Sequence, residues 1–223
     1  MADLTLRPSK APNLLIAPTS YAQQYQDQLN NALRLYFNQV DNGWSSVLGD
    51  NGARYFESPH IAAQDTTDQY AVTNTPTVVK WNTLDSGSGF TLNVDSTATA
   101  PYSGVYKIDY SLQLANTANV IHNAYVWLRV DGVDVPGSAS KFTLAARKSA
   151  GVYAFVVAYS SVTFEINGGS DIALMWATDQ AYNPVGPVDG VYIEHEAAQT
   201  VPFARPSIPS AIGSIVFVSR RPA

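Results

Sequence analysis

The residues that most often carry out catalysis or hold metal ions are few in this chain and lie far apart. Its 223 residues include three histidines, His60, His122 and His195, and no cysteine. His195 is flanked by Glu194 and Glu196. Successive side chains of a strand point to opposite faces, so the two carboxylates would share one face and the imidazole would lie on the other. We therefore expect solvated carboxylates and a partly buried histidine at this position, and neither a metal ion nor another cofactor.

A pair of carboxylates could hydrolyse a glycosidic bond, but no pair stands out in the sequence. Such a pair needs a separation of roughly 5–10 Å and one raised pKa. Four aspartates fall in predicted turns, where aspartate stabilises the bend: Asp65, Asp68, Asp131 and Asp134. The chain also lacks the phosphate-binding loop and the Gly-x-Ser-x-Gly nucleophile turn. We expect a protein that is not an enzyme, with a polysaccharide-degrading enzyme as the alternative.

The composition argues against nucleic acids and membranes as partners. Charged residues make up 14% of the chain, hydrophobic residues 46%, and the net charge is −5. Nucleic-acid binding needs a concentrated basic face, whereas the basic residues are scattered here. No apolar run approaches the roughly 18–20 residues of a membrane span, and the first residues do not resemble a signal peptide. We expect synthesis in the cytoplasm without export by the general route.

Residues 1–17 are predicted to form an extended arm. Their prolines prevent a stable helix, but Leu14, Leu15 and Ile16 form an apolar patch. Such a patch either packs on another surface or belongs to a disordered terminus. The two alternatives have opposite consequences, because only a docking arm can anchor the protein.

A single helix is predicted over residues 20–42. It begins with a capping box at Ser20 and Gln23 and ends at Asn42-Gly43, a common stop signal. The helix is too short for a stable isolated coiled coil, so it packs either on its own domain or against copies of itself. Its apolar face consists of Tyr25, Leu29, Ala32, Leu33, Tyr36 and Val40.

Two segments of different character follow the helix. Residues 43–68 are predicted to be a linker, because glycine and proline recur there. Residues 69–218 are predicted to be strands, and residues 219–223 a tail. In residues 106–114 apolar and polar side chains alternate, as in a half-buried antiparallel strand. Further strand-like segments lie at residues 78–81, 90–94, 126–130, 152–159, 162–166, 172–176, 191–196 and 212–218.

Turn signals between these segments complete the predicted fold. Asp131-Gly132 and Asn167-Gly168-Gly169 predict hairpins, and no long helical pattern interrupts the strands. We therefore predict an all-β fold, an antiparallel jelly-roll sandwich preceded by an extended arm and one N-terminal α-helix.

Phe90 precedes the segment Tyr102–Tyr110, in which a glycine is followed by alternating aromatic residues. This order is similar to that of the C1q and tumour-necrosis-factor family, in whose jelly roll a Phe-rich strand precedes a strand with glycine and alternating aromatic residues. The later strands match in order at Val126–Val133, Val162–Gly169, Ile172–Asp179 and Pro209–Phe217.

The resemblance implies a compact trimer with aromatic residues along its threefold axis. Candidates are Trp127, Tyr153, Tyr159 and Tyr192. Each could instead fill the sandwich of its own protomer, because both locations are apolar.

The most specific string of the N-terminal part is Leu33–Asn42, which reads Leu-Arg-Leu-Tyr-Phe-Asn-Gln-Val-Asp-Asn. With this string the N-terminal part resembles the start of small virion structural proteins of tailed bacteriophages, cyanophages among them. Further matches are Leu6-Arg7-Pro8, Pro12-Asn13-Leu14, Tyr21 and Tyr25. In such proteins an N-terminal anchor precedes a C-terminal β module.

Together, the two resemblances imply a non-enzymatic virion structural protein. Residues 1–42 would anchor it to capsid or tail proteins, and a trimeric jelly roll would serve as capsid decoration, head fibre or tail-associated fibre. The alternative is a tip module that binds a host-surface glycan or protein for host attachment. In that case the loops around Tyr102 and Tyr182 would face the ligand.

Overall fold

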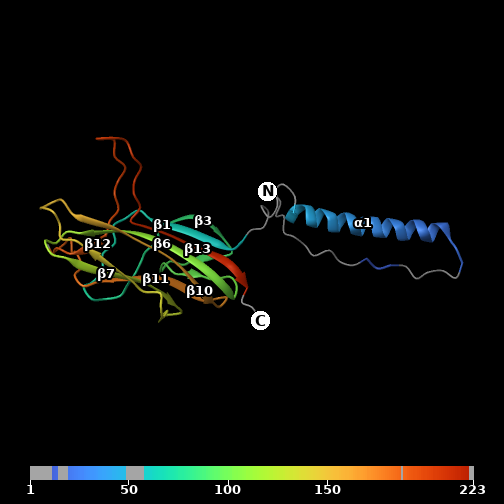
Figure 1. Ribbon diagram of the computed structural model, residues 1–223, viewed down its shortest axis with the longest axis horizontal. Helices are drawn as coiled ribbons and strands as arrows, with labels where there is room; N and C mark the ends of the chain where they lie inside the picture. The colour runs from blue at the N-terminus through green and yellow to red at the C-terminus, as the bar shows by residue number, and fades with distance from the viewer. Residues whose placement is uncertain (1–11, 15–19, 49–57, 187, 221–223) are drawn as a thin grey trace. The chain divides into compact units, whose positions relative to one another are not determined.

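The protein is represented by a computed structural model, which describes residues 12–14, 20–48, 58–186 and 188–220. The chain divides into two compact units, residues 1–57 and residues 58–223. The first unit contains the helix, and the second contains all of the described strands (Figure 1).

The helix α1 extends from Gln23 to Leu48 and therefore passes through the predicted stop at Asn42-Gly43. Glycine ends a helix by adopting a left-handed backbone, and Gly43 is not among the described glycines with positive φ. The predicted linker at residues 43–68 thus begins inside the helix. No helix in the described part of the chain is both long enough and apolar enough to cross a membrane.

The strands form two antiparallel sheets, which we call sheet A and sheet B. The path of sheet A is β10-β6-β13-β1-β3, with β12 also paired to β6. The bounds of these strands are Ala154–Ile166 for β10, Gly104–Asn116 for β6, Ala211–Arg220 for β13, His60–Asp65 for β1, Thr83–Ser88 for β3 and Val191–Ile193 for β12.

Sheet B follows the path β4-β5-β11-β7-β8, with β2 also paired to β11 and β9 to β7. Its strands are Thr91–Leu92 for β4, Ala98–Thr99 for β5, Asp171–Thr178 for β11, His122–Val130 for β7, Val133–Asp134 for β8, Thr77–Val78 for β2 and Ser140–Leu144 for β9.

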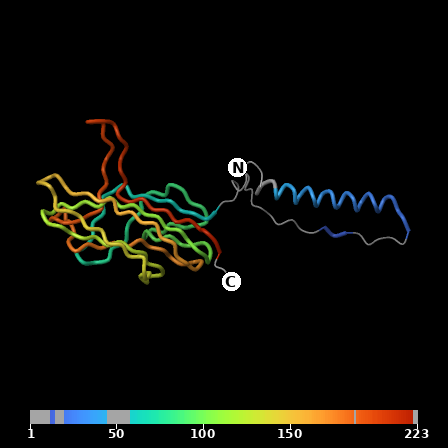
Figure 2. Tube along the Cα trace, in the orientation of Figure 1, coloured from blue at the N-terminus to red at the C-terminus, as the bar shows by residue number. Residues whose placement is uncertain are grey.

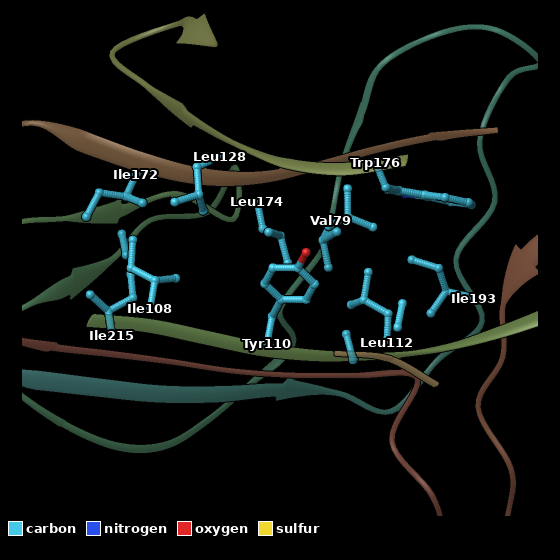
Figure 3. Close-up of a cluster of buried hydrophobic side chains, with 14 of the residues drawn as sticks. Val79, Ile108, Tyr110, Leu112, Leu128, Ile172, Leu174, Trp176, Ile193 and Ile215 are labelled. Carbon is cyan, nitrogen blue, oxygen red and sulfur yellow. The ribbon is translucent and has the colours of Figure 1, made fainter. Parts of the chain in front are cut away.

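The two sheets face each other and enclose the core. Figure 3 shows Tyr110 and Leu112 of sheet A pointing toward Leu174 and Trp176 of sheet B. The alternation predicted over residues 106–114 is confirmed, because every second side chain of β6 in this stretch is buried. The predicted fold class, an antiparallel jelly-roll sandwich, is confirmed as well.

The strand β1 lies inside the segment predicted to be a linker. Ile61 and Ala63 are buried, and β1 pairs with β3 and β13. Because the strand is short and directly follows Pro59, its own residues gave only a weak strand pattern. The strands that pair with it come later in the chain, so the local sequence does not indicate them.

One of the two predicted hairpins forms and the other does not. Asp131 and Gly132 have φ values of 49° and 79° and join β7 to β8 in a tight hairpin, as two-residue turns with positive φ do. Residues 167–169 instead lead from β10 in sheet A to β11 in sheet B. A glycine turn reverses the chain, but it does not decide whether the flanking strands pair.

Candidate oligomer interface

The strand β10 exposes a row of large apolar side chains on the outer side of sheet A. It lies at one end of the strand path of sheet A and pairs with β6 over its full 13 residues. Ala158 points into the core and is fully buried, so its neighbours along the strand point outward. Phe155, Val157 and Tyr159 are 55%, 56% and 61% exposed.

The strand β13 adds two more apolar side chains on the same side of the sheet. Tyr159 pairs with Ser111 of β6, which pairs with Ile212 of β13, and residues in register share a face. Ile212 and Val216 are both exposed. We call the surface formed by Phe155, Val157, Tyr159, Ile212 and Val216 the β10/β13 face.

Between these two strands, β6 contributes mostly uncharged side chains to the face. Ser111 and Gln113 are half-buried, and the Lys107 Nζ atom lies 3.0 Å from Asp109 Oδ2. Partial burial alone would raise the pKa of Asp109, but hydrogen bonding to Ser161 and Lys107 outweighs it and lowers that pKa. The carboxylate is thus ionised and locally neutralised, which reduces the cost of covering this surface.

In the described residues, no group of three or more His, Cys, Asp and Glu side chains could hold a metal ion. The three histidines are not gathered. His60 bonds Ser58 O and Ser86 Oγ, His122 Nδ1 lies 2.9 Å from Asp179 Oδ1, and His195 follows β12 outside any strand.

Of the four aromatic residues predicted to line a threefold axis, three belong to sheet A or adjoin it, and one belongs to sheet B. Tyr159 and Tyr192 belong to the outer side of sheet A, and Tyr153 directly precedes β10. Trp127 lies between the fully buried Val126 and Leu128 on β7, so it points outward from sheet B. Its position on the opposite side of the sandwich corrects the prediction, which could not tell the faces of the two sheets apart.

Tyr192 is buried beneath other tyrosines of its own protomer. Its ring centroid lies 5.8 Å from that of Tyr70 and 5.1 Å from that of Tyr182. We call these three residues the tyrosine cluster. Only Tyr70, at 41% exposure, presents much of its ring to the surface.

Two carboxylates bind the hydroxyls of the tyrosine cluster. Tyr70 donates to Asp68 at 3.1 Å and Tyr192 to Glu194 at 2.6 Å. Burial and the neighbouring carboxylate raise the pKa of Tyr70 to about 12 and raise that of Tyr192 as well. Burial, together with the charges of nearby carboxylates, also raises the pKa of Glu194.

The two loops predicted to face a ligand lie at opposite ends of β6. The Tyr102 carbonyl accepts a hydrogen bond from Tyr106, near the start of the strand. Tyr182 bonds through its backbone to Val191, which pairs with Asn116, the last residue of β6. A single ligand site therefore cannot include both Tyr102 and Tyr182, as the prediction of ligand-facing loops had allowed.

The helix keeps its predicted apolar side chains on one stripe. Tyr25, Leu29, Leu33, Tyr36 and Val40 are all half-buried, and no described side chain of α1 is fully buried. Among the arm residues, Leu14 is 48% exposed. The remaining two residues of the predicted patch, 15 and 16, lie outside the described residues.

Four residues of the β10/β13 face were missed as site residues: Phe155, Val157, Ile212 and Val216. A signal for the first two was present, because residues 152–159 are apolar at nearly every position. Such a run is typical of a strand that is covered on both faces. Among the described residues of the sandwich, the outward side chains Phe155, Val157 and Tyr159 of β10 are exposed, whereas Ala158 on its inner face is buried.

Comparisons with known proteins found matches among solved structures. No protein-family model and no curated protein matches the chain. Matching solved structures include the globular domain of the zebrafish complement 1qA protein, at 12% identity and a TM-score of 0.43, covering 74% of this chain and 100% of that one. Another is Eiger TNF from S. frugiperda, at 14% identity and a TM-score of 0.42, covering 74% of this chain and 96% of that one.

Proposed function

We propose that the protein is a non-enzymatic structural component of a tailed-phage virion and acts as a homotrimer. The β10/β13 face is the observation that carries the trimer. A long edge strand with exposed apolar side chains promotes association unless another chain covers it, and charged groups are few on this face.

The energetics favour covering this face. Complete burial of a Val, Ile or Phe side chain contributes about 1.5–3 kcal/mol, and the face exposes four such side chains and Tyr159 by 36% to 61%. Association costs about 4–15 kcal/mol in lost freedom of motion. Burial of the face in every protomer is comparable with that cost, and the uncharged Ser111 and Gln113 cost less to desolvate than charged side chains would.

The anchoring role is assigned to residues 1–42. The apolar stripe of α1 has no described side chain that is fully buried, and burying such a stripe supplies most of a helix's stability. Placement on a virion is supported by the resemblance of Leu33–Asn42 to the start of phage structural proteins.

The trimer is tested by measuring the mass of the purified chain. Light scattering should give three times the 24.1 kDa of one chain. The Val157→Asp variant should dissociate at least tenfold more readily, because it places a carboxylate in the contact. Val133→Asp is the matched control, since Val133 is 70% exposed on sheet B. A monomeric wild type, or equal behaviour of both variants, contradicts the proposal.

The virion role is tested by cryo-electron microscopy of the assembled particle. Three copies of this density at threefold or quasi-threefold points of the capsid would identify a decoration or head fibre, with residues 1–42 against the shell. Copies on the tail would identify a tail-associated fibre. Particles that lack the protein contradict the role.

Host-glycan recognition is the second candidate function, and the tyrosine cluster favours it. The partly exposed Tyr70 ring lies near two carboxylates, and sugars commonly stack on aromatic rings while their hydroxyls bond to such groups. Tyr182→Ala should reduce glycan-array signal and host adsorption severalfold, whereas Tyr102→Ala, at the other end of β6, should leave both unchanged. Absence of a glycan signal together with normal adsorption of the Tyr182→Ala virion contradicts this function.

A further inference from the structure

Residues 196–208 form a two-stranded ribbon that projects from the sandwich. Glu196 and Ile208 exchange backbone hydrogen bonds of 3.0 and 2.8 Å, and Gln199 and Arg205 exchange bonds of 3.1 and 3.0 Å. The ribbon connects β12 to β13, and the backbone trace shows it standing clear of both sheets (Figure 2).

The ribbon is stabilised by its own contacts. The Arg205 guanidinium bonds to the Glu196 carboxylate and also donates to the carbonyls of Ala197 and Pro206 at 3.3 and 3.2 Å. The two charges therefore neutralise each other at the base. Residues 197–204, Ala-Ala-Gln-Thr-Val-Pro-Phe-Ala, contain no charged side chain.

The end of the ribbon is apolar and exposed. Val201 and Phe203 are 80% and 63% exposed, and Pro202 between them is exposed as well. Because the ribbon projects from its own sandwich, these side chains cannot be buried there without refolding it.

The base of the ribbon adjoins the β10/β13 face. Gln113 of β6 accepts a backbone hydrogen bond from Glu194, just before the ribbon, and donates one to Ser210, just after it. The same Gln113 pairs with Val157 on β10. In Figures 1 and 3 the red ribbon leaves the sandwich on the side of sheet A, away from sheet B.

We propose that the ribbon is an arm that binds a second copy of this chain. A copy that packs on the β10/β13 face necessarily lies beside the projecting ribbon, and the uncharged tip can bury Val201 and Phe203 against it. Each ribbon contacts the next protomer, and three such contacts close a ring. The inference rests on the proposed trimer and adds a second, separate contact to it.

Site-specific cross-linking tests the arm, because the chain has no cysteine and one introduced thiol reacts alone. Full-length Phe203→Cys protein carrying a benzophenone maleimide is assembled from mixed ¹⁵N-labelled and unlabelled chains. Illumination should produce cross-links between labelled and unlabelled chains at least tenfold more often than in the matched Val185→Cys protein. Val185 is 93% exposed in a different loop.

A loss-of-contact variant supplies the second measurement. The double variant Val201→Ser/Phe203→Ser removes both apolar side chains. It should raise, by at least tenfold, the concentration below which the trimer dissociates, whereas Val185→Ser should not change that concentration. The tip is exposed in the protomer, so circular dichroism should show an unchanged fold.

The outcomes separate the arm from the trimer itself. A wild-type trimer that cross-links only within chains, or that dissociates equally in both serine variants, overturns the arm and leaves the trimer intact. A monomeric wild type overturns both. Cross-links that form only in virions, and only to a different protein, also overturn the arm.

Discussion

At the scale of single residues, the tyrosine cluster places an acid where its charge is unfavourable. Glu194 is half-buried next to Tyr192, and its pKa is raised above the ordinary value of 4.5 by burial and by the charges of Glu196 and Asp68. The hydrogen bond from Tyr192 opposes this rise without cancelling it. The folded protein therefore holds the Glu194 proton more tightly than the unfolded chain does.

The raised pKa of Glu194 predicts that the free energy of unfolding depends on pH. The contribution of Glu194 is fully present below pH 4.5 and is lost as the pH rises through its raised pKa. Glu194→Gln retains an acceptor for Tyr192, so it should raise Tm by roughly one to a few degrees at pH 8 and change little at pH 4. Thermal melts between pH 4 and 8 measure this, with Glu165→Gln on β10 as control. A lower Tm at pH 8 would contradict the assignment.

The tyrosine cluster also shows the limit of residue-level prediction. Tyr192 and Tyr182 are ten residues apart in the sequence, and nothing in either residue indicates that Tyr70 completes the group. The sequence analysis named Tyr182 as a ligand-facing residue and Tyr192 as a candidate for the threefold axis, two roles that do not involve their mutual packing. Their mutual packing depends on the pairing of β12 with β6, which is a tertiary feature.

At the scale of elements, α1 carries its apolar stripe without burying any described side chain. Leu33→Asp places a charge in the middle of this stripe. If the stripe packs against other chains, the amount of the Leu33→Asp variant in particles should fall at least tenfold, because an unpaired buried charge is costly. Asn38→Asp adds the same charge at an exposed position and should incorporate normally. Quantitative immunoblots of purified particles measure both, and equal incorporation would disprove the anchoring role of this stripe.

Strands were predictable where one face is polar. In β6 the alternation locates the strand and its buried side, because the two faces meet different surroundings. In β10 nearly all of residues 152–159 are apolar, so the pattern locates the strand but not its buried side. The predicted segments 152–159 and 162–166 also merge into the single strand β10, since no turn separates them.

At the scale of the whole molecule, the order of strands in each sheet lay beyond the sequence pattern. The candidate interface combines β10, β6 and β13, which are neighbours in the sheet but far apart along the chain. The same long-range pairing separates Trp127 from Tyr159. Aromatic residues can therefore be assigned to strands correctly from the sequence, while the assignment still groups residues from the outer sides of two different sheets.

The four tryptophans of the chain are divided between its two units, and this gives the protein internal optical probes. Trp44 belongs to α1 and is 59% exposed, whereas Trp81, Trp127 and Trp176 belong to the unit of residues 58–223. In a Trp44→Phe protein all tryptophan emission comes from the sandwich, and the difference from wild type isolates the helix. Docking of the helix onto a capsid or tail surface can thus be followed as a blue shift of one indole, without an external dye.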